Sequence, residues 1–241
     1  MVGRAMTDRR FVWAGAIAAI FIIITLEAHS REVKGRQSAR QQQADWHGAV
    51  IKLAIPVTRQ IDGERRHLTE DCTGTIIQAA PVKILTAWHC FDGMDDLSRP
   101  GRARITGKWY PTRLTEHGAS MARDWALLEL PSNSPTDLVS IDVDTGEGTL
   151  ASGTALTMAG FSGDQALGEL GQVLTWDSDC TLIAYVERRG QTDCRAFKGA
   201  SGGPVLLARG GGWVVIGVIS AKSAAGMTLF TPASQFRSFL R

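Results

Sequence analysis

The sequence predicts an all-β protein, and three observations support this prediction. Short apolar runs, many of them rich in Val, Ile, Thr or Trp, recur at strand length from Asp45 onward. Gly, Asp, Asn, Pro and Ser fill the intervals between the runs. No internal stretch keeps a sustained helical period. Many short strands at regular spacing are typical of a β-barrel or a β-sandwich.

The expected strands are Ala49–Ile55, Thr73–Ile77, Lys83–Thr86, Ala103–Ile105, Ala126–Leu130, Ala155–Phe161, Gly171–Trp176, Thr181–Val186, Pro204–Leu207 and Trp213–Ser220. A segment rich in Pro and turn residues, 131–144, indicates a crossing between two halves of the fold. Near the end of the chain, Phe236, Phe239 and Leu240 recur at positions i, i+3 and i+4, which predicts a short amphipathic helix.

The N-terminus has the pattern of an export signal. Residues 1–10 carry three arginines, and residues 11–26 then contain no charged side chain. Leu26 stands where a cleavage site would need a small residue, so 1–28 is either a signal peptide or an uncleaved signal anchor. Residues 29–44 are polar and read as a linker. We therefore expect a secreted or periplasmic protein, or one anchored to the membrane by this N-terminal segment.

Composition limits the classes of partner. The chain has 241 residues, enough for one large all-β domain or two small ones. The 26 basic and 24 acidic residues give a net charge of +2, which provides no reason to expect nucleic acid as a partner. The cysteines, at positions 72, 90, 180 and 194, form two close pairs without the spacing of a metal site. Export would favour disulfides, for which four cysteines allow three pairings.

Three motifs contain the residue types of nucleophilic catalysis. They are Thr86–Cys90 (TAWHC), Asp124–Leu130 (DWALLEL) and Gly199–Val205 (GASGGPV). A serine hydroxyl is a weak nucleophile and needs a neighbouring base, a role that histidine fills near neutral pH. The glycine-rich motif also fits the nucleophile turn of an α/β-hydrolase, but that fold needs a histidine after the serine. All five histidines precede Ser201, so this alternative fails.

Taken together, the three motifs resemble those of the chymotrypsin-like (trypsin-like) serine proteases, with a bacterial branch expected, and the resemblance covers Cys72 to the end. It implies two antiparallel six-stranded β-barrels, over residues 45–135 and 136–241. His89 would be the base, Asp124 its orienting carboxylate and Ser201 the nucleophile. The backbone N–H groups of Gly199 and Ser201 would form an oxyanion hole.

The resemblance has further implications for cysteines, cofactors and partners. A disulfide links the family's positions that match Cys72 and Cys90, which leaves Cys180 and Cys194 for a second bond. No cofactor is expected, and the substrates would be proteins or peptides. The alternative function is that of a catalytically silent binding or scaffold protein with a protease fold.

Two departures from the family pattern affect activation and specificity. Ala200 replaces the aspartate that usually precedes the nucleophile, so we expect an oxyanion loop that forms without zymogen cleavage. The candidate specificity pocket includes Arg195, Lys198, Ser220 and Lys222. These cations could favour acidic or polar side chains at the cleavage site, or they could be solvated surface charges.

Overall fold

The computed structural model describes residues 36–40, 42–94, 96–97, 99–144, 146, 149–164, 167–222 and 226–240. The predicted signal or anchor, 1–28, lies outside these residues. Within the described part of the chain, no helix is both long enough and apolar enough to cross a membrane.

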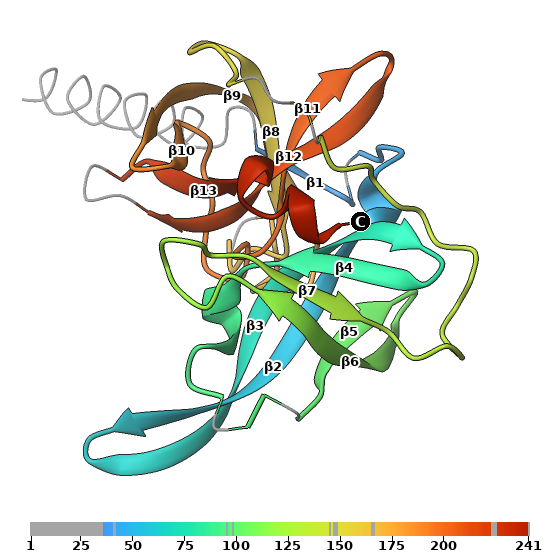
Figure 1. Cartoon of the computed structure of the whole chain (residues 1–241), viewed down its shortest axis with the longest axis vertical. Helices are drawn as coiled ribbons and strands as arrows, with labels where there is room; N and C mark the ends of the chain where they lie inside the picture. The colour runs from blue at the N-terminus through green and yellow to red at the C-terminus, as the bar shows by residue number, and fades with distance from the viewer. Residues whose placement is uncertain are drawn as a thin grey trace, which may run out of the picture. The chain divides into compact units, whose positions relative to one another are not determined.

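The first half of the described chain forms a closed antiparallel β-barrel (Figure 1). The strand order around the barrel is β2-β3-β4-β7-β6-β5. The strands are β2 (Val50–Ile61), β3 (Glu64–Ala79), β4 (Val82–Thr86), β5 (Gly101–Ile105), β6 (Lys108–His117) and β7 (Ala126–Glu129). The whole of β2 pairs with residues 64–75 of β3, and their hairpin extends beyond the barrel wall at the lower left of Figure 1.

The second half forms another closed barrel, in the order β8-β9-β10-β13-β12-β11, because β8 pairs with both β11 and β9. Its strands are β8 (Ala155–Gly160), β9 (Thr175–Val186), β10 (Arg189–Thr192), β11 (Pro204–Arg209), β12 (Gly212–Lys222) and β13 (Thr228–Pro232). The chain therefore has the predicted all-β architecture of two six-stranded antiparallel barrels.

An additional short strand, β1 (Arg36–Ser38), pairs with residues 175–177 at the start of β9. We predicted a linker over residues 29–44, but this part of it belongs to a sheet. The sequence contains no apolar alternation here, because the two buried side chains, Arg36 and Ser38, are polar. Polar side chains can occupy buried strand positions only when hydrogen bonds satisfy them, and sequence alone does not reveal those partners.

Other differences from the predicted elements have local causes. The predicted strand Gly171–Trp176 begins only at Thr175, since Gly171 has a φ of +83° and the preceding residues form turns. Strand β6 was not predicted, because its residues alternate poorly and include Pro111. The predicted C-terminal helix is replaced by two 3-10 turns, η3 (Ala233–Gln235) and η4 (Arg237–Phe239), separated at buried Phe236.

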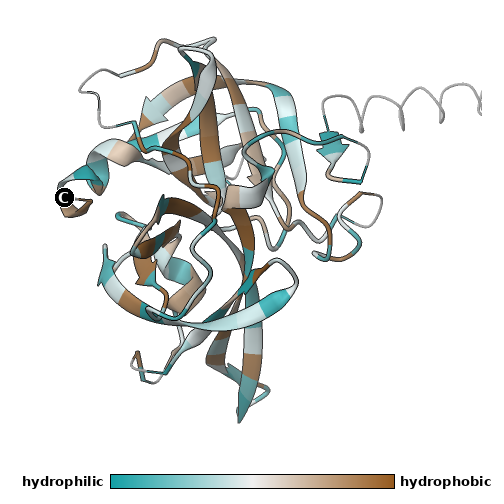
Figure 2. Cartoon of the chain, turned by 90° about the vertical axis from the view of Figure 1, so that its right-hand side faces the viewer, coloured by the Kyte–Doolittle hydropathy of each residue, from teal (hydrophilic) through white to brown (hydrophobic). Residues whose placement is uncertain are grey.

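Hydrophobic and hydrophilic residues alternate along several strands, as the colours of the ribbon in Figure 2 show. In β5, for example, Gly101, Ala103 and Ile105 are buried whereas Arg102 is exposed, which is the period of two expected for a strand.

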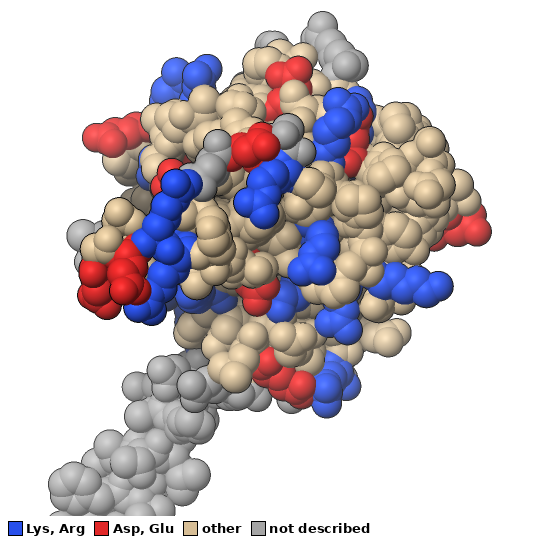
Figure 3. All heavy atoms as spheres, turned by 90° about the horizontal axis from the view of Figure 1, so that it is seen from below, with Lys and Arg blue, Asp and Glu red and all other residues tan. Residues whose placement is uncertain are grey.

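On the outside, Lys and Arg are interspersed with Asp and Glu on the face drawn in Figure 3, in keeping with a net charge of only +2. One apolar core cluster contains residues of both barrels, such as Leu53 and Val218, so the barrels pack on each other.

Candidate active site

His89 lies in a tight turn at the end of a buried strand. The turn, η2 (Trp88–Phe91), follows β4 after one residue. A disulfide between Cys90 and Cys72 ties the turn to β3. The His89 side chain is 24% exposed, so the ring is partly buried but still accessible to solvent.

Asp124 is fully buried and hydrogen-bonded to His89. Its Oδ1 accepts the His89 backbone N–H at 2.8 Å, and its Oδ2 lies 2.7 Å from His89 Nδ1. The Ser220 hydroxyl, at the end of β12, also donates to Oδ2. Burial opposes ionisation of the carboxyl, but the bonds from His89 and Ser220 outweigh this effect, so the pKa of Asp124 lies below its ordinary value. Asp124 is therefore an anion that fixes the orientation of the His89 ring.

Ser201 lies in a turn that requires glycine on both sides. Gly199 and Gly202 have φ values of +92° and +83°. A Cβ on Gly199 would lie 2.4 Å from the Phe161 carbonyl oxygen, and one on Gly202 would lie 2.1 Å from Thr86 Oγ1. Since both conformation and space exclude a side chain, this turn depends on its glycines.

Within this turn, two backbone N–H groups remain available. The Ala200 N–H donates to the Phe197 carbonyl at 3.0 Å, and the Gly203 N–H donates to the Ala200 carbonyl at 2.9 Å. Among the described residues, no acceptor is found for the N–H of Gly199 or of Ser201. These two donors are the ones that the sequence predicted for an oxyanion hole.

Thr73 connects the Ser201 turn to the first barrel, a contact that the sequence did not reveal. Its N–H donates to the Ser201 carbonyl at 2.8 Å, and its hydroxyl donates to the Gly199 carbonyl at 2.7 Å. Cys90 Sγ lies 4.0 Å from the Ser201 carbonyl oxygen. These contacts bring the turn of Ser201 against the turn that carries His89.

Comparisons with known proteins agree with this arrangement. Residues 72–218, more than half of the chain, match the family model of a trypsin-like peptidase domain. The chain belongs to the trypsin-like peptidase family. No curated protein sequence matches the chain.

Solved structures of a bacterial protease share the fold of this trypsin-like peptidase. The Rv3671c protease from M. tuberculosis in its active form has a TM-score of 0.60 and 16% sequence identity, over 81% of this chain and 80% of that chain. The inactive form of the Rv3671c protease has a TM-score of 0.55 and 15% identity, over 81% of this chain and 88% of that chain.

Beside Ser201, the peptidase has a pocket of about 180 Å³. Its lining residues are Ala196, Phe197, Lys198, Ser201, Ile219, Ser220, Ala221 and Lys222. Three of the predicted pocket residues, Lys198, Ser220 and Lys222, thus line it, although the Ser220 hydroxyl is engaged by Asp124.

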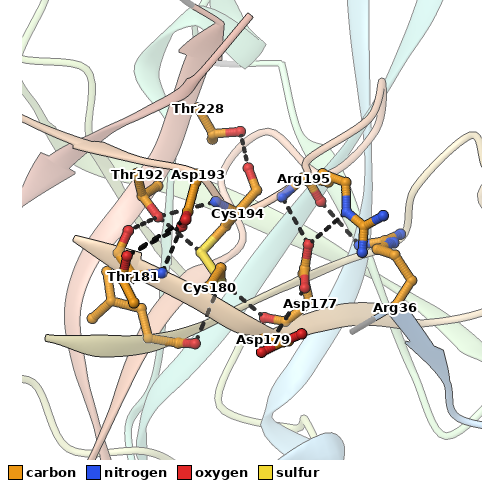
Figure 4. Close-up of a disulfide and its surroundings, with 11 residues drawn as sticks. Arg36, Asp177, Asp179, Cys180, Thr181, Thr192, Asp193, Cys194, Arg195 and Thr228 are labelled. Atoms are coloured by element: carbon orange, nitrogen blue, oxygen red, sulfur yellow. Dashed lines mark hydrogen bonds and ion pairs between the residues drawn. A yellow bond between two sulfur atoms is a disulfide. The ribbon is translucent and has the colours of Figure 1, made fainter. Parts of the chain in front are cut away.

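The fourth predicted pocket residue, Arg195, does not line the pocket. Its Nε and its backbone N–H both lie 3.0 Å from Asp177 Oδ2, as Figure 4 shows. Asp177 is 1% exposed, and a buried carboxylate needs such a charged partner. The nearby acid Asp193 is also occupied, since its Oδ1 accepts the Thr181 N–H at 2.6 Å.

The second disulfide joins Cys180 on β9 to Cys194, just ahead of the pocket residues (Figure 4). Both predicted disulfides are therefore present, and no described cysteine is free. Another pocket, of about 260 Å³, shares Lys198 with the first pocket and includes Gly199 of the Ser201 turn. It is lined by Asp71, Phe161, Gly163, Leu170, Gly171, Lys198 and Gly199. A larger cavity of about 730 Å³ includes none of His89, Asp124 and Ser201 in its lining.

Proposed function

We propose that this trypsin-like peptidase, of a bacterial branch, is a serine endopeptidase in which Ser201, His89 and Asp124 form the catalytic triad. The observation that most strongly supports this proposal is the pair of hydrogen bonds by which buried Asp124 holds both the backbone and the Nδ1 of His89. Because Nδ1 faces Asp124, the opposite nitrogen, Nε2, carries the lone pair that can accept a proton.

In the first half of the reaction, His89 Nε2 takes the proton of Ser201 Oγ while Oγ attacks the carbonyl carbon of the scissile bond. The charge that develops on the carbonyl oxygen is stabilised by the N–H groups of Gly199 and Ser201. The imidazolium of His89, stabilised by Asp124, then protonates the leaving amine. The peptide C–N bond breaks, and the acyl group remains as an ester on Ser201.

In the second half, a water molecule loses its proton to His89 Nε2 and attacks the ester carbon. The same two N–H groups stabilise the oxyanion, and the proton returns to Ser201 Oγ when the C–O bond breaks. The products are a carboxylic acid and an amine, and every proton is accounted for by His89. The residues present suffice for this sequence without a cofactor.

Two pockets at the Ser201 turn, which meet at Lys198, support cleavage within a chain rather than at its end. The pocket of about 180 Å³ would take the side chain before the scissile bond, and the pocket of about 260 Å³ would take residues after it. Lys198 borders both, and Lys222 lies at the first. We propose that these cations favour an acidic or polar side chain before the cleaved bond.

We also propose that the oxyanion loop needs no zymogen cleavage. Ala200 has no group with which a new N-terminal amine could pair, and it is 2% exposed within an apolar core cluster. A Cβ on Gly160 would lie 2.7 Å from Ala200 Cα, so this site is closely packed.

The two disulfides suit the oxidising environment outside the cytoplasm. We propose that the domain lies there, either secreted or anchored to the membrane by residues 1–28.

A fluorophosphonate probe tests the proposed nucleophile. We expect it to label the exported protein at Ser201 and the Ser201→Ala variant to lose both labelling and peptide cleavage. Ser178→Ala, which removes an exposed hydroxyl on β9, is the matched control and should behave like wild type. Absence of labelling in folded wild-type protein would instead support the silent binding protein.

Cleavage of a diverse peptide library tests the proposed specificity. We expect enrichment of acidic or polar residues before the cleaved bond, and reduced enrichment in Lys222→Ala. A clear preference for Lys or Arg at that position would contradict the role given to Lys198 and Lys222.

A further inference from the structure

Arg36, on β1, is a buried cation outside the proposed triad. The residue is 7% exposed, and burial lowers its pKa from the ordinary arginine value, although Asp164 and Asp177 oppose the shift. Strand β1 lies outside the closed ring of strands and pairs with Thr175–Asp177 of β9, a stretch that β10 does not reach. Barrel closure therefore does not require β1, and the burial of Arg36 needs another explanation.

The guanidinium of Arg36 contacts the segment that leads into the pocket. Its Nη1 donates to the Arg195 carbonyl at 3.1 Å, while Nη2 donates to Thr175 Oγ1 at 2.7 Å and to Asp164 Oδ2 at 3.3 Å. Because Asp177 holds the N–H of Arg195 and Arg36 holds its carbonyl, the backbone of Arg195 is fixed on both sides (Figure 4).

The same guanidinium also contacts a wall of the pocket. Arg36 Cζ lies 5.1 Å from the centroid of the Phe197 ring, within the range of a cation–π interaction. Lys222 Nζ lies 5.2 Å from that centroid. Phe197 lines the pocket of about 180 Å³ beside Ser201 and follows Arg195 by two residues.

We propose that Arg36 is a positioning residue for substrate binding, which holds the pocket wall Ala196–Lys198 in place by fixing the Arg195 carbonyl and the Phe197 ring. This role rests on the proposed peptidase function, in which that wall receives the side chain before the scissile bond. Arg36 touches neither Ser201 nor His89, so it acts on how substrate is held rather than on the chemical step.

The test compares four variants in the full chain. Arg36→Met keeps an unbranched side chain but loses the hydrogen bonds, and Arg36→Lys keeps the charge. The double variant Arg36→Met/Asp164→Asn also removes the negative charge of Asp164, the carboxylate with which Arg36 forms an ion pair. Arg40→Met is the matched control, since Arg40 lies on the same segment in an exposed pair with Glu169 at 2.9 Å.

In Arg36→Met we expect KM for peptides that fill the pocket to rise by about tenfold, as for loss of a hydrogen bond to a charged group, with little change in kcat. Hydrolysis of a small acetate ester, which does not reach the pocket, should stay near the wild-type rate. Arg36→Lys should recover part of the loss, and Arg40→Met should stay within about twofold of wild type.

Hydrogen exchange gives a readout that does not depend on catalysis. Amides of residues 196–198 should exchange faster in Arg36→Met and in the double variant, but not in Arg40→Met. Restoration of KM and exchange rates in the double variant would show that only the charge balance between Arg36 and Asp164 matters and would overturn the positioning role. Unchanged KM and exchange in Arg36→Met would overturn it too. Failure of the peptidase proposal would appear separately, as activity that survives Ser201→Ala.

Discussion

The two barrels hold their parts of the proposed site by different means. In the first barrel, side-chain hydrogen bonds to one buried carboxylate, Asp124, orient His89. In the second barrel, the backbone itself orients Ser201, through glycines at positive φ and turn hydrogen bonds. The first arrangement depends on charge and on correct protonation, whereas the second depends on the absence of side chains. The two halves should therefore fail differently when each is changed.

The largest effect is expected from removal of the charge in the first barrel. Asp124→Asn keeps the shape of the side chain but favours the wrong tautomer of His89, so kcat/KM should fall by about 10⁴-fold. Steady-state cleavage of a peptide substrate measures this loss. Asp137→Asn, an exposed change, is the control. A loss below tenfold would show that Asp124 does not orient the base.

The second largest effect is expected when a side chain is added to the Ser201 turn, which the backbone of the second barrel holds in place. Gly199→Ala introduces a Cβ 2.4 Å from the Phe161 carbonyl oxygen and should displace one oxyanion donor. We expect kcat to fall by about 10²–10³-fold, as for loss of one such donor. Gly63→Ala is the matched control, since Gly63 also has a positive φ, of +80°, but has open space around it. Equal effects of the two variants would show that backbone strain alone explains the loss.

The sequence predicted these two halves unequally well. His89, Asp124 and Ser201 all lie in sequence motifs, and the glycines around Ser201 predict the turn in which it lies. The hydroxyl that supports Asp124 could not be found in this way, because Ser220 follows it by 96 positions and meets it only when the barrels pack together. Arg195 was predicted to belong to the specificity pocket, but it does not line it. Its pairing with Asp177 depends on a burial pattern that spacing does not encode.

The strands show the same difference between features with a local sequence pattern and features that depend on distant contacts. Those with longer apolar runs, such as β8 and β12, were predicted, whereas β1, β6, β10 and β13 were not. Their positions are set by hydrogen bonds to neighbouring strands, and in β1 by the buried contacts of Arg36. Such elements have no local pattern, since their stability comes from partners distant in the chain.

The two disulfides offer a matched comparison of the barrels. They join residues separated by 18 and by 14 positions, so loop-closure entropy predicts a similar loss of about 3 kcal/mol in unfolding free energy for removal of either. Their effects on activity should differ. Cys72→Ala/Cys90→Ala should lower kcat, by up to about 10²-fold, because Cys90 adjoins His89. Cys180→Ala/Cys194→Ala should mainly raise KM, because Cys194 precedes the pocket wall.

Chemical unfolding and peptide kinetics on the two double variants check this prediction. If both variants change kcat and KM alike, the disulfides stabilise the fold as a whole and do not act on separate halves of the site.

The smallest effect is expected from Ser220→Ala. Among the residues that the structure describes, Ser220 is the one side-chain donor that crosses from the second barrel to Asp124. Because that hydroxyl helps to hold the pKa of Asp124 below its ordinary value, its loss should raise this pKa. A depressed carboxyl pKa stabilises the fold above the unfolded value of about 3.9, and the stabilisation is lost as pH falls through the folded pKa. The variant should therefore be less stable by about 2 kcal/mol at pH 7, and this difference should shrink below a pH of about 4.

Urea unfolding at neutral and acidic pH measures this linkage, and the Asp124→Asn background is its control. In that background no carboxyl remains to titrate at position 124, so Ser220→Ala should cause a loss that does not vary with pH. A pH-independent loss in the wild-type background would mean that Ser220 supports the barrel contact by packing alone. A pH-dependent loss would instead show that the second barrel, besides carrying Ser201, stabilises the charge on which the first barrel's half of the site depends.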